Sequence, residues 1–230
     1  LHQRGGEAKR VLYGHFSLRL NLCALRIGTV ILASKVRIIM RKTVFSTPIV
    51  TPILRAFSLA GLKLMGWSAK GEPLIHQRCV LIAAPHTSNW DFPLMLMIVL
   101  KLRLRIFWMG KHTLFPFPFG WLMKWLGGIP IDREASHNVV NATVRQYREN
   151  DELIVLIPPE GTRAKVDRWK TGFYHIAKNA KVPILLGYVD SENKVAGFAD
   201  FFTPTGDLDK DMIEIRRFYT EKTGLIIKNS

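Results

Sequence analysis

His86 and Asp91 are the residues of this 230-residue chain whose types and spacing most directly suggest chemistry. They stand five residues apart, where an apolar run, residues 78–84, ends at Pro85 and a second apolar segment, residues 90–100, begins. The first run has the length of a buried strand and the second that of a buried helix. On one continuous helix the two side chains would point about 140° apart. With His86 in the loop and Asp91 in the first helical turn they can meet, and the carboxylate would then orient the imidazole as a general base.

A structural interpretation of the same residues is also open. Ser88 and Asp91 have the spacing of a helix capping box, and the Asp91 carboxylate suits the positive end of a helix dipole. A histidine beside such a cap is usually structural. The pair alone therefore does not establish catalysis.

A second charged group follows the apolar run of residues 153–157. Two prolines stop this predicted strand, and Gly161 permits a tight backbone path after it. Glu160 and Arg163 are thus placed at the end of a buried strand, where open α/β sheets bind ligands.

Two further apolar pieces repeat this arrangement. Residues 127–133 end in the charged pair Asp132 and Arg133, and residues 182–187 are again strand-like. Arginine suits bidentate recognition of phosphate. Each charged pair on its own is better explained as a surface ion pair of little energetic worth. Their order and spacing together favour a functional site.

Four of these segments, taken in order, resemble the motifs of the glycerolipid acyltransferase family, whose best-known members are the lysophosphatidate acyltransferases. That family has a His-x-x-x-x-Asp motif, a Gly-x-x-x-x-Arg-like block, a Pro-Glu-Gly-Thr-Arg block and an apolar segment around Val-Pro. The matching residues are His86 with Asp91, residues 128–133, residues 159–163 and residues 182–184, and the resemblance covers residues 40–188. Pro85 and Pro158 depart from the Asn and Phe that many members carry, which leaves the acceptor specificity open.

The resemblance implies transfer of a fatty acyl group from acyl-CoA or acyl-carrier protein to the free hydroxyl of a lysophospholipid, above all 1-acylglycerol-3-phosphate. His86 would be the general base and Asp91 would orient it, so that the hydroxyl attacks the thioester directly. Such a reaction has no covalent intermediate and requires no metal and no cofactor besides the acyl donor. The residues expected to bind the substrate are Lys111, which matches the family between the first two motifs, and Arg133, Glu160, Gly161, Thr162 and Arg163.

Other functions remain open at this stage. A hydrolase using Ser88 is one, although no Gly-x-Ser-x-Gly sequence surrounds that serine. An acyltransferase for a different lysolipid is a second, and a catalytically inactive, basic membrane-binding module is a third.

The charge of the chain points to a membrane surface. The net charge is +15, and residues 1–42 contain nine Lys or Arg against one acid, Glu7. Such a chain binds nucleic acid or anionic lipid. Bulky apolar residues interleave with these cations and no nucleic-acid motif is visible, so we expect anionic lipid and no nucleic acid as the partner. The longest charge-free stretch of the N-terminal part of the chain, residues 43–54, is too short to span a bilayer. This favours peripheral attachment to the cytoplasmic face.

Three parts are expected along the chain. Residues 1–39 are a basic amphipathic extension, residues 40–67 a membrane-associating helical segment, and residues 68–230 the acyltransferase domain. Because the chain opens with Leu1 and the better-patterned region with Met40, we expect residues 1–39 to precede the true start; the alternative is a genuine basic membrane helix. Cys23 and Cys79 have no disulfide or metal-ligand spacing, and no cleavable signal peptide is evident.

Alternating strands and helices predict an α/β fold with a largely parallel sheet flanked by helices. The aromatic segment, residues 115–125, is open to two interpretations, packed core or exposed surface. Residues beyond 189 receive no firm assignment. The predicted strands are residues 78–84, 104–109, 129–132, 152–157 and 183–189, and the predicted helices are residues 90–100, 136–149 and 171–180, with helix in 40–67.

Overall fold

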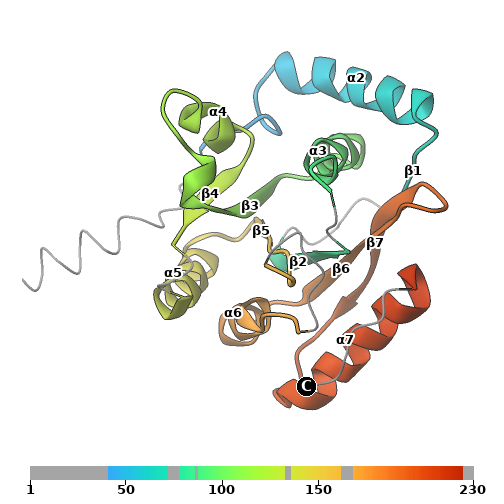
Figure 1. The fold of residues 1–230 in the computed structure, drawn as a ribbon. Coiled ribbons are helices and arrows are strands. Elements are labelled where there is room, and N and C mark those ends of the chain that lie inside the picture. The colour runs from blue at the N-terminus through green and yellow to red at the C-terminus, as the bar shows by residue number, and fades with distance from the viewer. Residues whose placement is uncertain (1–40, 72–77, 86–87, 133–135, 162–167, 225–230) are drawn as a thin grey trace, which may run out of the picture. The chain divides into compact units, whose positions relative to one another are not determined.

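Seven strands form one sheet in the order β1-β7-β6-β2-β5-β3-β4 (Figure 1). The computed structural model describes residues 41–71, 78–85, 88–132, 136–161 and 168–224. The five strands from β6 to β4 in this order run parallel, whereas β7 pairs antiparallel with β6 and parallel with β1. The strands are β1 (Ser68–Lys70), β2 (Arg78–Ala84), β3 (Ile106–Lys111), β4 (Gly128–Ile131), β5 (Leu153–Leu156), β6 (Ile184–Asp190) and β7 (Val195–Phe202).

Helices cover both faces of this sheet. Helix α3 lies on one face with α2 packed on its outer side, and α5, α6 and α7 lie on the other face (Figure 1). The helices are α2 (Val50–Leu64), α3 (Asp91–Lys101), α4 (Gly120–Trp125), α5 (Ser136–Glu149), α6 (Gly172–Ala180) and α7 (Leu208–Thr223), with a 3-10 turn η2 (His112–Leu114). The expected α/β architecture with a largely parallel sheet is therefore confirmed.

The core follows from the alternation of side chains along the strands. Leu81 of β2 and Ile154 of β5 are fully buried against Val99 of α3, and Trp108 of β3 belongs to the same cluster. On the other face, Phe173 of α6 is fully buried. Burying one large apolar side chain contributes about 1.5–3 kcal/mol, so two such layers fix α3 and α6 on the sheet. Strands buried on both faces have no polar face, which is why they are continuous apolar runs in the sequence.

The predicted strands and helices between residues 78 and 190 all occur, with ends that differ by one or two residues. In the expected helical segment 40–67, the helix covers only Val50–Leu64. Pro52 stands in its first turn, where the missing amide hydrogen costs no helical hydrogen bond. Gly66, with φ +71°, follows its end. Among the described residues, no helix has both the length and the hydropathy that crossing a bilayer requires.

Helix α7 and strand β7 complete the fold beyond residue 189. The Asp207 side chain accepts a hydrogen bond from the Lys210 amide at the start of α7, and Gly224, with φ +65°, ends the helix. These are ordinary start and stop signals, so α7 could have been found in the sequence. Strand β7 lies between β6 and β1, and the short β1 has no pattern of its own because only three residues pair.

Candidate active site

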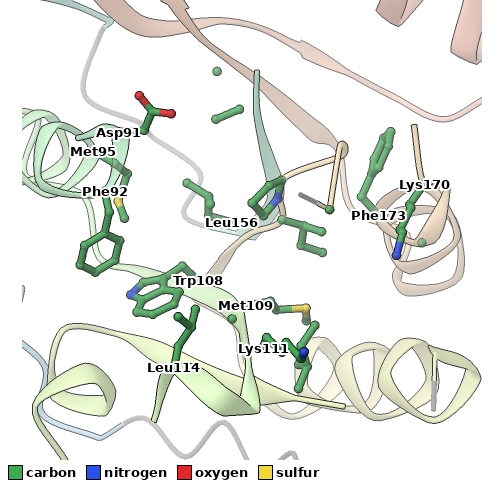
Figure 2. A pocket seen from close by; sticks show the side chains of 18 of the residues that line it. Asp91, Phe92, Met95, Trp108, Met109, Lys111, Leu114, Leu156, Lys170 and Phe173 are labelled. Carbon is green, nitrogen blue, oxygen red and sulfur yellow. The ribbon is translucent and has the colours of Figure 1, made fainter. Parts of the chain in front are cut away.

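The carboxyl ends of the parallel strands open onto a cavity of about 640 Å³. Its charged lining comes from Asp91, Lys111, Asp132 and Lys170, which stand at or next to the ends of strands or the starts of helices. Figure 2 shows Asp91, Lys111 and Lys170 arranged around this cavity from three separate elements. A cavity at this edge of an open α/β sheet is the position in which such folds bind ligands.

Asp91 is held at the start of α3 by the turn before it. The Ser88 amide donates to Oδ2 of Asp91 over 2.8 Å, and Oγ of Ser88 accepts from the Trp90 amide over 3.1 Å. The Asp91 carboxylate thus closes the turn before α3; the predicted capping box does not form, because α3 begins at Asp91 itself and the Ser88 hydroxyl bonds to Trp90 instead. Pro85, at the end of β2, lines the cavity as well. His86 lies outside the described residues, so its pairing with Asp91 stays a prediction.

Lys111 and Asp132 reach the cavity from neighbouring strands. Lys111 is the last residue of β3 and pairs in register with Ile131, the last residue of β4, and Asp132 follows directly. The parallel pairing therefore brings together two residues that are separated by more than twenty positions in the sequence. Arg133 lies outside the described residues.

The chain turns sharply after β5. The Gly161 amide donates to the Pro158 carbonyl over 3.2 Å, and the Lys170 amide donates to the Pro159 carbonyl over 2.8 Å. Gly161 has φ +66°, and a Cβ at that position would lie 3.0 Å from Cδ of Lys170. A glycine is required here both by the backbone conformation and by the lysine that lies against it. Thr162 and Arg163 lie outside the described residues.

Glu160 is buried below this turn, with 8% of its surface exposed. Burial, and after it the charge of Glu160, raises the pKa of the Tyr219 hydroxyl well above its usual value. Tyr219 of α7 donates to the Gly187 carbonyl over 2.7 Å, lies 3.2 Å from the Ile82 carbonyl and packs edge-on against Trp169 with ring centroids 5.0 Å apart. Helix α7 therefore links the turn after β5 to strands β2 and β6.

Sequence analysis missed Lys170 as a site residue and Tyr219 as the residue that ties α7 to the sheet behind the site. Lys170 stands two residues before α6, and only the folded chain brings its side chain against Gly161. The residues between the two are outside any predicted element. Tyr219 lies in a helix that was not assigned, so no local signal linked it to the site.

The remainder of the cavity is apolar. Phe92 and Met95 of α3 lie in its wall beside Trp108 of β3 and Leu114 of η2 (Figure 2), and Val99 of α3 lines it as well. The ring of Trp108 contacts that of Phe92 edge-on, with centroids 4.9 Å apart, and its Nε1 donates to the Leu126 carbonyl over 2.9 Å. Such a lining offers an extended hydrocarbon the same environment as the protein core.

No three His, Cys, Asp or Glu side chains in the described part of the chain are grouped so that they could hold a metal ion. The charged groups that line the cavity are two carboxylates and two ammonium groups, from Asp91, Asp132, Lys111 and Lys170; the polar side chains of Asn89, Thr113 and Tyr188 line it too. This set suits binding of an anionic group beside a proton-transferring residue.

The fold and this cavity define the class, an α/β protein with a cavity, charged at one part and apolar at another, at the carboxyl ends of its strands. Residues 68–185 match the family model "Acyltransferase", and the chain belongs to this family. It is 30% identical over 131 residues to the 1-acyl-sn-glycerol-3-phosphate acyltransferase of Streptococcus pneumoniae (strain ATCC BAA-255 / R6), covering 53% of this chain and 48% of the relative. The chain thus spans about half the length of the curated relative it matches.

The fold is also similar to that of a solved structure, the crystal structure of the 1-acyl-sn-glycerophosphate (LPA) acyltransferase PlsC from Thermotoga maritima. The TM-score is 0.54, and the match covers 78% of this chain and 82% of that one. Because only 17% of the residues are identical, this likeness concerns the fold alone.

Proposed function

We propose that this protein transfers a fatty acyl group from acyl-CoA or acyl-carrier protein to the free hydroxyl of a lysophospholipid, with 1-acylglycerol-3-phosphate as the acceptor and phosphatidate as the product. The observation that carries the proposal is the cavity, which has carboxylates and ammonium groups at the strand ends and a hydrocarbon lining beyond them. A lysophosphatidate molecule has the same division into a phosphate head and an apolar chain.

His86 acts as the general base in this proposal. The imidazole takes the proton of the acceptor hydroxyl as its oxygen attacks the thioester carbonyl carbon. The C–S bond then breaks, and the imidazolium returns a proton to the leaving thiolate, so no protein nucleophile is required. Asp91 orients His86 and stabilises its cationic form, as the carboxylate of a catalytic triad does. The hydrogen bond from the Ser88 amide holds Asp91 in place for this role.

The phosphate of the acceptor is held by cations at the strand ends. Lys111 and Lys170 line the cavity, and Arg133 and Arg163 follow Asp132 and Gly161, which line it too. Guanidinium groups bind phosphate through two parallel hydrogen bonds and ammonium groups act as point charges. Glu160, Gly161 and Thr162, which precede Arg163 in the sequence, bind the acceptor together with it in this proposal.

The acceptor is drawn from a membrane to which helix α2 binds. Phe57 and Leu64 of this helix are 69% and 87% exposed, whereas Ser58 is buried. The polar side chain of Ser58 therefore faces the protein together with Leu62, while most apolar side chains of α2 face outward, unlike those of an ordinary surface helix. An outward apolar face flanked by Arg55 and Lys63 is typical of a helix that lies in the headgroup layer of an anionic membrane. We assign this attachment to the cytoplasmic face.

An acyl-transfer assay of the full chain tests the proposal. Purified protein is incubated with 1-acylglycerol-3-phosphate and other lysolipids, each with acyl-CoA and with acyl-carrier protein as the donor. We expect phosphatidate to form faster than any other product. Transfer to another lysolipid alone would change the acceptor, and no transfer with any pair would leave an inactive membrane-binding module.

Ser88 offers a matched test of the hydrolase alternative. Its Oγ is engaged by the Trp90 amide, and the proposed reaction makes no use of it. Ser88→Ala should therefore retain most of the acyl-transfer rate. We expect a stability loss of about 0.5–2 kcal/mol, because the hydrogen bond from the Trp90 amide to the Ser88 hydroxyl is lost. Loss of activity in a folded Ser88→Ala protein, together with release of free fatty acid by the native chain, would support a serine hydrolase instead.

A further inference from the structure

Three large aromatic side chains project from the aromatic segment into solvent. Phe117 is 97% exposed, Phe119 63% and Trp121 68%. Soluble proteins seldom display neighbouring aromatic rings without a partner, and such a patch marks a protein or membrane contact. The proposed acceptor and α2 do not account for it.

The inward residues of the same segment hold these rings in place. Phe115 stacks on Trp108 with centroids 5.7 Å apart, and Met123 and Trp125 pack on the core beneath α3. The Gly120 amide donates to the Pro116 carbonyl over 2.7 Å, and a Cβ on Gly120 would lie 2.7 Å from the Phe115 carbonyl oxygen. The exposed rings thus stand on a tight, packed turn, so binding through them costs little conformational entropy.

The charge around the aromatic segment is entirely positive. No acidic residue occurs from position 92 to position 131, whereas five Lys or Arg do. Of these, Arg105 lines a second hollow together with Arg41, Lys42, Phe45 and Ser46. Aromatic rings interleaved with cations match the interface of an anionic bilayer, where rings lie at headgroup depth and cations meet lipid phosphates.

The aromatic segment is also joined to the chain that leads into α2. The Val44 amide donates to the Trp125 carbonyl over 2.9 Å, and Nε1 of Trp125 donates to Oγ1 of Thr47 over 3.1 Å. The aromatic segment and α2 both lie on the face of the sheet that α3 covers (Figure 1). The exposed rings and the outward face of α2 therefore belong to one continuous side of the protein.

We propose that Phe117, Phe119 and Trp121 form a second membrane contact, which inserts into the headgroup layer of an anionic bilayer beside α2. Leu114 and Met123, on either side of these rings, line the cavity. Insertion would therefore place one wall of the cavity at the lipid surface, where a lysolipid can enter without crossing water. This inference goes beyond attachment through α2 and is tested separately from it.

The test uses the full chain with the triple substitution Phe117→Ser, Phe119→Ser and Trp121→Ser. Its matched control is Phe201→Ser with Ile213→Ser, which removes exposed apolar side chains from β7 and α7. Sedimentation with vesicles of phosphatidylcholine and phosphatidylglycerol measures the partition constant. We expect a fall of at least about tenfold for the triple variant, about 1.4 kcal/mol, and little change for the control.

A second measurement reports on insertion itself. Lipids brominated near the headgroup should quench native tryptophan fluorescence more strongly than that of Trp121→Phe, because Trp121 would lie at that depth. Equal partition of the triple variant and the native chain, with equal quenching of Trp121→Phe, would overturn the proposal even if an α2 variant loses binding. A native dimer that the triple variant abolishes, with vesicle binding unchanged, would instead assign the rings to contact with a second copy of the chain.

Discussion

The backbone amide of Ser88 donates a hydrogen bond of 2.8 Å to Oδ2 of Asp91, the first residue of α3. This bond joins the structural and the catalytic interpretations of the segment, because one carboxylate both closes the turn before the helix and lines the cavity. Such a bond fixes the side-chain rotamer, and a fixed rotamer is what a carboxylate needs in order to orient a histidine. The two interpretations are therefore compatible.

The first prediction concerns His86 and Asp91. His86→Ala should lower the acyl-transfer rate by at least about 10²-fold with normal folding, since it removes the proposed base. Asp91→Asn should lower both the rate and the melting temperature, because it also weakens the hydrogen bond that Asp91 accepts from the Ser88 amide. Thermal melts and turnover are measured on the same samples. A folded His86→Ala protein with near-normal turnover would exclude His86 as the base.

The second prediction is that Lys170 binds the acceptor phosphate. Lys170→Met should raise the KM for 1-acylglycerol-3-phosphate about tenfold, which corresponds to about 1.4 kcal/mol. The KM for acyl-CoA should change little. Lys181→Met is the control, because this exposed lysine caps the other end of α6 and the same charge is lost away from the cavity. An increase confined to the acyl-CoA KM would assign Lys170 to the phosphates of the donor.

The third prediction concerns the turn at Gly161. Gly161→Ala places a methyl group at φ +66°, a conformation that costs roughly 1–2 kcal/mol, and pushes it against Cδ of Lys170. We expect lower stability in urea and a higher acceptor KM. Gly172→Ala is the matched control, because its Cβ would meet nothing within 4 Å. Similar acceptor KM values for the two variants would show that Lys170 does not depend on the shape of this turn.

The fourth prediction concerns membrane attachment through α2. Ile53→Ser with Phe57→Ser in the full chain should reduce sedimentation with anionic vesicles, because both side chains lie on the outward face. Because the packed residue Leu62 is untouched, the melting temperature should stay near that of the native protein. If the double variant sediments as the native chain does at physiological salt, α2 is not the anchor.

The fifth prediction concerns Tyr219. Tyr219→Phe leaves the Gly187 carbonyl without its buried donor and should cost about 1–3 kcal/mol of stability, measured by urea unfolding. It should also raise the acceptor KM, since Tyr219 packs against Trp169, the neighbour of Lys170 in the sequence. Tyr147→Phe removes a similar buried bond, to the Cys79 carbonyl, and should destabilise the protein without changing that KM. Equal KM values would confine Tyr219 to a structural role.

Much of the fold could be predicted from the sequence. Strands β2, β5 and β6 are buried on both faces and so are unbroken apolar runs, which need no tertiary information to be found. Strand β1 could not be found, because three residues carry no period and pair only after β7 is in place. The short helix α4 lies in an aromatic stretch whose inward and outward residues are chemically alike.

The sequence by itself determined the α/β class and the family resemblance, because both depend on local patterns and on the order of motifs. It also placed Lys111, Asp132 and Glu160 after strands and Asp91 at the start of a helix. Only the tertiary structure decided which groups share a cavity. Lys170 lines it because its side chain lies against Gly161, whereas Tyr219 ties α7 to two strands more than thirty residues away in the sequence. It also decided that Ser58 faces inward while Phe57 faces solvent. Such contacts depend on packing between distant segments, and no local pattern in the sequence records them.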